Sequence, residues 1–133
     1  MAVESTLLFG NAAAEGSLRV EVGEPVDLPK RRMEVAVRVS IPLDQITILP
    51  VADGFASQLQ LRFAVQDDDG RQSPIPVVPW SFSLASIPPA GAYVTYETKL
   101  LLRRKTHQAV VAVHDPASGR IFSTGLEIVP VAR

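Results

Sequence analysis

Three consecutive carboxylates, Asp67, Asp68 and Asp69, precede Gly70 and are the residues best suited to metal chemistry. Calcium takes oxygen ligands, and clustered carboxylates in a loop can supply them. The later ligands of an EF-hand loop are missing, and Asp with Gly is also what a hairpin turn uses for local hydrogen bonds and a positive φ. We therefore expect a turn, with no metal or other cofactor. A melting temperature shifted by calcium or by a chelator would favour the metal alternative.

Two histidines and a neighbouring acid are the candidates for acid–base catalysis. His107 and His114 are seven residues apart on one predicted strand, so they point to opposite faces and cannot share a metal ion. Asp115 opens a turn and is better placed to bind the backbone of Ala117 or Ser118 than to orient an imidazole. No serine lies in a nucleophile-elbow pattern. The sequence predicts no catalytic residue, and we expect the protein not to be an enzyme.

Two basic runs, Lys30 to Arg32 and Arg103 to Lys105, would form an anion-binding patch if they lay at one end of the fold. Solvated hairpin tips are the commoner role of such runs, and the interleaved aromatics of a single-strand binder are absent. The chain has 13 Lys and Arg against 14 Asp and Glu, a formal net charge of −1. This balance gives no overall attraction to nucleic acid, so we expect no nucleic-acid partner.

The few large aromatics raise a carbohydrate-binding alternative. Trp80, Tyr93 and Tyr96 would make a stacking platform for a sugar if all three were exposed. By alternation, however, Trp80 shares a face with Phe82 and is expected in the core, and Tyr96 is a candidate corner tyrosine whose hydroxyl fixes a crossover. Tyr93 alone would be a weak platform.

Short β-strands must position these residues. Residues 91–130 read as a meander of three antiparallel strands, joined through 104–106 and 115–119. In its middle strand Ala109, Val111 and Val113 share one face, which is the period of a half-buried strand. Leu100, Leu101 and Leu102 run together, so we expect the first strand to be covered on both sides or to carry a bulge. We expect this meander to be the central element around which the fold is organised.

The rest of the chain also alternates. The clearest strand carries its apolar residues on one face until Pro42 ends it, and we expect it at the centre of a sheet: Met33, Val35, Val37, Val39, Ile41. A short extended piece at 44–50 and a turn at 52–54 lead into a long strand from Phe55. Prolines within 71–84 place the returning strand at a sheet edge. An apolar start at 5–10 adds an edge strand, and 11–16 is a loop.

Composition agrees with one all-β domain spanning 1–133, with 1–17 as a loosely ordered edge segment. Eleven prolines and eight glycines suit many turns, and the absence of cysteine excludes disulfides and thiolate metal sites. We predict an immunoglobulin-like β-sandwich of about seven to eight antiparallel strands. No apolar run reaches the ~18 residues of a membrane span, and no signal peptide is recognisable. If the protein is exported, we expect its export signal to lie outside this chain.

Three stretches carry a family resemblance: VAVRVSIPLDQITILP (35–50), LQLRFAVQDDDGRQSPIP (59–76) and the segment from Tyr93 to Ile128, which contains VHDPASG. Together they resemble the C-terminal β-domain of bacterial proteins related to the von Willebrand factor A domain, mostly exported proteins of acidobacterial type. The resemblance covers about Leu7 to Val129. Its elements are turns, and the D-x-x-G-R turn is matched at 67–71 with one extra residue. None of them is a catalytic motif.

The resemblance implies a non-enzymatic accessory domain that binds protein, with a neighbouring von Willebrand factor A domain as the expected partner. It also implies a periplasmic or secreted location, as part of a longer exported protein. The DxSxS adhesion motif of the A domain is absent, so no adhesion-site residue is carried over. A carbohydrate- or small-ligand-binding module on the same fold is the alternative. We expect no direct membrane insertion and a monomer or weak dimer, with Leu7 to Phe9 as a possible contact.

Overall fold

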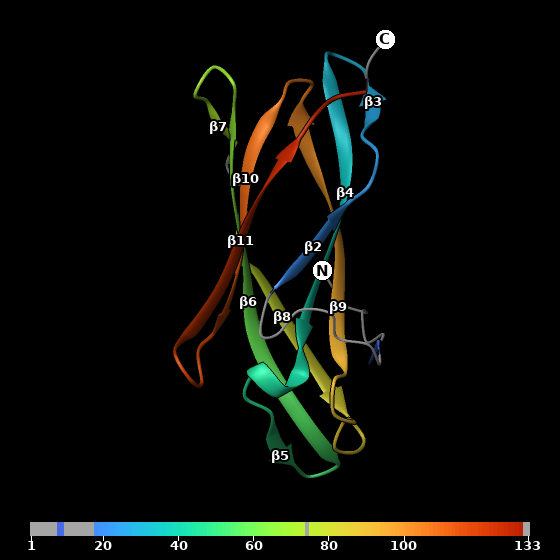
Figure 1. Cartoon of the computed structure of the whole chain (residues 1–133), viewed down its shortest axis with the longest axis vertical. Coiled ribbons are helices and arrows are strands. Elements are labelled where there is room, and N and C mark those ends of the chain that lie inside the picture. The colour runs from blue at the N-terminus through green and yellow to red at the C-terminus, as the bar shows by residue number, and fades with distance from the viewer. Residues whose placement is uncertain (1–7, 10–17, 74, 132–133) are drawn as a thin grey trace.

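The structure is a computed structural model, and it describes residues 8–9, 18–73 and 75–131. Its strands form two antiparallel sheets that pack together along a common long axis (Figure 1). The predicted all-β sandwich is therefore confirmed. No helix in the described ranges is long and apolar enough to cross a membrane.

The first sheet is built around one long strand. β4 (Arg32–Pro42) pairs with β9 (Tyr93–Arg103) on one side and with β2 (Arg19–Val22) and β3 (Val26–Leu28) on the other, and β1 (Leu8–Phe9) pairs with the start of β9. The five alternating apolar residues of β4, from Met33 to Ile41, are at most 2% exposed. This strand is central because its inward face is entirely apolar, as the sequence predicts.

The second sheet is organised by β6 (Gly54–Asp67). β6 pairs on one side with β10 (His107–Asp115), which continues to β11 (Arg120–Ile128). Along its length it also pairs with β5 (Leu49–Val51), β7 (Gln72–Ser73) and β8 (Val78–Leu84). Among the described strands β8 pairs with β6 alone, so the predicted edge position of this proline-containing strand is confirmed.

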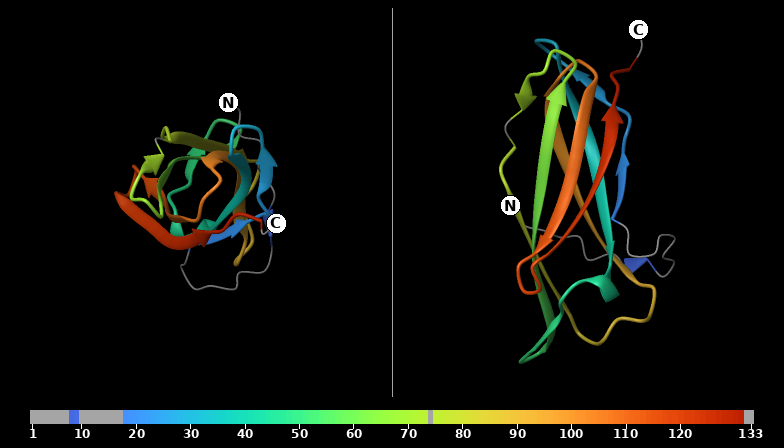
Figure 2. Two further views of the ribbon diagram at one scale, coloured as in Figure 1. Left: turned by 90° about the horizontal axis from the view of Figure 1, so that it is seen from above. Right: turned by 60° about the vertical axis from the view of Figure 1, so that its left-hand side comes forward.

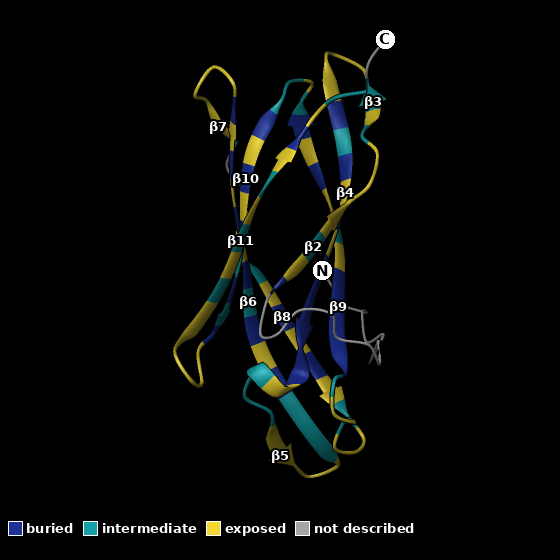
Figure 3. Ribbon diagram, viewed as in Figure 1, coloured by how far each residue is buried: buried dark blue, intermediate teal, exposed yellow. Residues whose placement is uncertain are grey.

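The core lies between the two sheets, and Figure 2 shows the strands wrapped around it when the molecule is seen from above. At mid-length the Trp80 ring packs on Tyr96 with 5.5 Å between ring centroids and on Phe82 with 6.4 Å. The buried residues recur at every second position of the long strands (Figure 3). Each large aliphatic side chain so buried contributes roughly 1.5–3 kcal/mol, which drives the sheets together.

The predicted three-strand meander is wrong at its first connection. β9 pairs with β4 and β1, whereas β10 pairs with β6 and β11, so the turn at 104–106 crosses from one sheet to the other. Alternation gives each strand an inward face but does not say which strand is its neighbour. The hairpin from β10 to β11 through 115–119 is confirmed. Leu100 to Leu102 also need neither a second cover nor a bulge, because Leu101 alone points outward and is 54% exposed.

Smaller differences concern connections. The segment expected to be extended at 44–50 begins as a 3-10 helix, Leu43–Gln45, and only its end joins β5. The described residues form eleven strands where about seven to eight were expected. The run expected at 71–84 forms two strands, β7 and β8, and β3 is a further strand after the break at 23–25. The edge strand expected at 5–10 is present as β1, and the loop expected at 11–16 lies outside the described residues.

Candidate functional site

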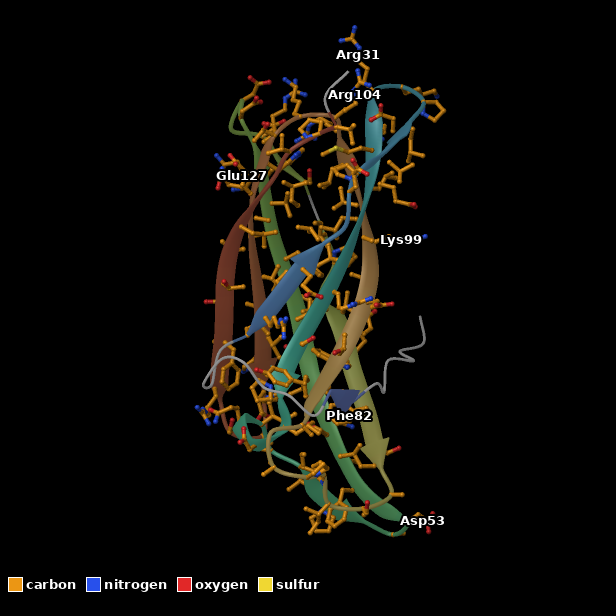
Figure 4. All side chains as sticks on the ribbon, turned by 45° about the vertical axis from the view of Figure 1, so that its right-hand side comes forward. Arg31, Asp53, Phe82, Lys99, Arg104 and Glu127 are labelled. Carbon is orange, nitrogen blue, oxygen red and sulfur yellow. The ribbon has the colours of Figure 1, made fainter. Side chains whose placement is uncertain are left out.

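Three turns meet at one end of the sandwich, which we call the turn end: 29–31, 67–71 and 103–106. The Arg104 amide donates to the Arg31 carbonyl at 2.9 Å, and the Arg103 guanidinium donates to Asp67 at 2.9 Å. Arg31 and Arg104 are labelled together at this end in Figure 4. The fold thus brings the two basic runs and the acidic run of the sequence to one place.

Asp67 organises the turn end from a buried position. Its Oδ1 accepts the backbone amides of Asp69 and Arg71, each at 2.9 Å, and its Oδ2 accepts the Arg103 guanidinium. Burial raises the pKa of Asp67, but the hydrogen bonds from Arg71, Arg103 and Asp69 outweigh that effect and hold the pKa below its usual value. The carboxylate therefore serves the turn, as expected from the Asp and Gly composition of the run.

The other two carboxylates of the run face a lysine. Oxygens of Asp67, Asp68 and Asp69 lie within 4.8 Å of one another, which is a spacing that a cation would accept. The Lys105 ammonium already donates to Asp69 and lies 3.9 Å from Asp68. The hydrogen bond with Asp69 and its charge raise the pKa of Lys105. We expect calcium and chelators to leave the melting temperature unchanged, because Lys105 already pairs with Asp68 and Asp69 and the Asp67 carboxylate is bound to Arg103 and to its own turn.

The residues of the two basic runs divide into two groups. Arg103 is paired with Asp67, Arg104 with Asp27 at 3.2 Å, and Lys105 with Asp69. In contrast, the basic side chains of the β3–β4 turn and of the first residue of β4 have no carboxylate within 4.0 Å among the described residues, and all are exposed: Lys30, Arg31, Arg32. The anion-binding patch considered from the sequence is thus reduced to one run.

A second buried carboxylate fixes the β10–β11 turn. Asp115 accepts the Ala117 amide at 3.2 Å and the Ser118 hydroxyl at 3.0 Å, and it also accepts the Thr47 amide at 2.8 Å. Burial raises the pKa of Asp115, but these hydrogen bonds, led by that of Thr47, hold it below its usual value. The sequence indicated the bonds within the turn. It gave no sign of Thr47, which lies 68 residues away.

The two histidines do not form a site. His107 is fully buried, with Nδ1 2.7 Å from the Lys105 carbonyl oxygen, whereas His114 lies half-buried with Nδ1 3.4 Å from Gln60. They project to opposite faces of β10, as predicted. Because the Asp115 carboxylate is occupied by its turn, it does not orient an imidazole for catalysis.

The aromatic platform considered from the sequence is buried. Trp80, Tyr93 and Tyr96 are each at most 1% exposed, and Tyr96 lies within β9 against Trp80. Trp80 was expected in the core, but the exposed position considered for Tyr93 is wrong, since its side chain is 1% exposed at the start of β9, between β4 and β1. A row of exposed aromatics, which would favour a sugar ligand, is absent from the described residues.

A groove on the outer face of the first sheet is lined by charged side chains that form ion pairs with one another. Arg38 lies 3.6 Å from Glu21 and donates to Glu97 at 2.6 Å, and these three residues form one row across β2, β4 and β9. Exposed pairs of this kind contribute little to stability and form an ordinary solvated face. We assign no ligand to this groove.

The opposite end of the molecule is apolar. It comprises β5, the 52–53 turn and the 85–91 loop, and we call it the apolar end; Asp53 marks its tip in Figure 4. Leu49 and Val51 are 55% and 50% exposed, and Ile87 is 74% exposed. A shallow hollow beside Val51 is lined by residues of the β5–β6 hairpin and by Leu84 and Ala85 of the β8 strand and its exit. Sequence reasoning missed this surface, because its residues come from two connections.

Fold and surfaces place the chain in the class of antiparallel all-β sandwich domains. Scans against protein-family models and curated proteins find no match. Among solved structures the chain is similar to the X-ray structure of Northeast Structural Genomics Consortium target SoR45, with 18% sequence identity over 89% of this chain and 90% of that chain, and a TM-score of 0.46. At these values the similarity carries no functional argument.

Proposed function

We propose that this protein is a non-enzymatic accessory domain that binds another protein through its apolar end. The observation that carries the proposal is the exposure of Leu49, Val51 and Ile87 together at one end of the sandwich. Single exposed apolar residues are ordinary, but a group of them beside a hollow is typical of a contact surface. Such surfaces give affinity when apolar side chains fill a partner's pockets and exclude water.

The backbone holds this surface in a fixed shape. Gly54 closes the β5–β6 hairpin with a φ of +143°, and a Cβ at this position would lie 2.2 Å from the Leu84 carbonyl oxygen. The hairpin therefore touches the end of β8 directly, which fixes Val51 beside Leu84. A rigid contact surface loses less conformational entropy on binding than a mobile one.

The resemblance to the β-domains of von Willebrand factor A-related proteins supports a particular partner. In those proteins the β-domain accompanies an A domain, and contacts between domains of one chain typically bury about 600–1,500 Å². An apolar end of this kind is suited to such a contact. We therefore propose a von Willebrand factor A domain as the partner, in an exported protein.

The test is capture of exported proteins from the source organism on the immobilised domain. One variant carries Leu49→Asp, Val51→Asp and Ile87→Asp, and the control carries Val110→Asp and Ile121→Asp on the outer face of the second sheet, where both residues are also exposed. Melting curves establish that each variant is folded.

We expect a protein that contains an A domain to bind the wild type and the control saturably. This binding should be lost in the apolar-end variant. Equal capture by all three proteins, or capture by none, would contradict the proposal.

A further inference from the structure

We propose that the turn end is a second binding site, for an acidic segment of a polypeptide. This inference goes beyond the proposed function, because it concerns the opposite end of the molecule. It starts from charge. The turn end holds seven basic residues (Lys30, Arg31, Arg32, Arg71, Arg103, Arg104, Lys105) and four acidic ones (Asp27, Asp67, Asp68, Asp69), a formal charge of +3 in a chain whose total is −1.

Most of the excess charge lies on Lys30, Arg31 and Arg32, with Arg71 as a further exposed basic residue of this end. The acidic residues of this end face Arg103, Arg104 and Lys105. No carboxylate within the described ranges lies within 4.0 Å of a basic group of Lys30, Arg31 or Arg32. These three cations are consecutive and exposed. They are therefore available to an anionic ligand without breaking an existing pair.

The backbone of this turn is strained. Lys30 and Arg31 have φ of 63° and 57°, a left-handed conformation that glycine or asparagine adopts more readily. Backbone strain of this kind clusters at ligand-binding sites. Arg32 lies opposite Arg103 across β4 and β9, but Arg103 is already paired with Asp67, so of these two cations Arg32 is the one that an anionic ligand can bind.

The surroundings favour a polypeptide over other polyanions. Beside Arg32 on the same outer face, the next row across the sheet is Val26, Glu34 and Leu101. Glu34 is paired with Lys99 at 3.7 Å, and Val26 and Leu101 are 56% and 54% exposed. No aromatic side chain between residues 18 and 131 whose burial is described is exposed for stacking on bases. Three consecutive cations without a carboxylate within 4.0 Å in the described part of the chain are also fewer than the four to eight typical of binding to anionic membranes. On this surface, cations lie next to exposed apolar residues. A polypeptide segment in which acidic residues lie next to apolar ones would complement it.

The experiment measures binding of a fluorescein-labelled ten-residue peptide of alternating glutamate and leucine by fluorescence anisotropy. Its matched probe has glutamine in place of every glutamate. A single-stranded oligonucleotide and vesicles containing phosphatidylserine are the other ligands. The variant carries Lys30→Gln, Arg31→Gln and Arg32→Gln. The control carries Arg19→Gln, Arg62→Gln and Lys99→Gln, so that both proteins have the same net charge.

We expect the glutamate peptide to bind the wild type and the control with affinities within about twofold, and the turn variant at least tenfold more weakly. Equal losses in both variants would overturn the inference, as would tighter binding of the oligonucleotide, the vesicles or the glutamine peptide. No binding of the glutamate peptide would overturn it too. The apolar-end variant of the proposed function should bind the peptide normally, which separates failure at one end from failure at the other.

A second variant tests the strained turn. Lys30→Gly with Arg31→Gly removes the cost of the left-handed backbone together with two of the charges. We expect a melting temperature equal to or above that of the wild type, with peptide binding at least fivefold weaker. Retained binding would contradict the assignment of the site to these side chains.

Discussion

Individual polar residues in this domain act mainly on their own turns. Asp67 and Asp115 are both buried, and each uses its carboxylate to close the loop that follows it. The Asp and Gly composition indicated these local bonds, because such bonds join neighbours in the chain. The Thr47 amide and the Arg103 guanidinium were not predictable as partners, since they arrive from distant segments. Sequence therefore identifies a turn more easily than it identifies the residues that the turn binds.

Acidification should destabilise the domain through these carboxylates. Their folded pKa values lie below the unfolded value of about 3.9, so their contribution is present above that pH and is lost as the pH falls through the folded pKa. We expect Asp115→Asn to be less stable than the wild type at pH 7, with a difference that shrinks below about pH 4. Urea unfolding from pH 7 to pH 2.5 measures this. A difference that stays constant over that range would contradict the assignment.

Substitutions at two glycines measure the cost of backbone strain separately from the cost of steric contact. At Gly54 a Cβ would meet the Leu84 carbonyl, whereas at Gly119, with a φ of +80°, it would meet nothing within 4 Å. We expect Gly119→Ala to cost about 1 kcal/mol from the left-handed conformation alone, and Gly54→Ala to cost at least about 2 kcal/mol more, because the hairpin must move away from β8. Equal losses in thermal unfolding would mean that the hairpin does not touch β8.

At the scale of elements, alternation predicted most strands and their inward faces but not their neighbours. β4 was placed correctly, since five inward apolar residues admit only a buried face. The assumed pairing of β9 with β10 failed, because a short turn can join strands of one sheet or of two, and only packing against β4 and β6 decides. Basic and acidic runs were visible in the sequence. Their meeting at the turn end depended on that crossover.

The register of β4 can be tested by placing an aspartate on each face of the strand in turn. Val37 is 2% exposed, while the neighbouring Ala36 faces outward opposite Lys99. We expect Val37→Asp to abolish folding, because an unpaired buried charge costs more than about 4 kcal/mol. Ala36→Asp should melt within a few degrees of the wild type. Circular dichroism on both variants measures this, and an unchanged melting curve for Val37→Asp would mean that the register is wrong.

At the scale of the whole molecule, the two ends of the sandwich differ in chemistry. One end is apolar and the other carries excess positive charge (Figure 4). Neither character was predictable from composition, because the chain is nearly neutral and its exposed apolar residues are scattered along the sequence. The fold brings exposed apolar residues together at one end and basic residues together at the other. Under the two proposals above, the domain would join two partners, one at each end.

Hydrogen exchange with and without the captured partner tests the central claim most directly, namely that the apolar end is where this domain contacts protein. We expect protection on binding over residues 49–56 and 84–91, with the outer face of the second sheet unchanged. Protection confined to that outer face, or no change at the apolar end, would contradict the proposed function.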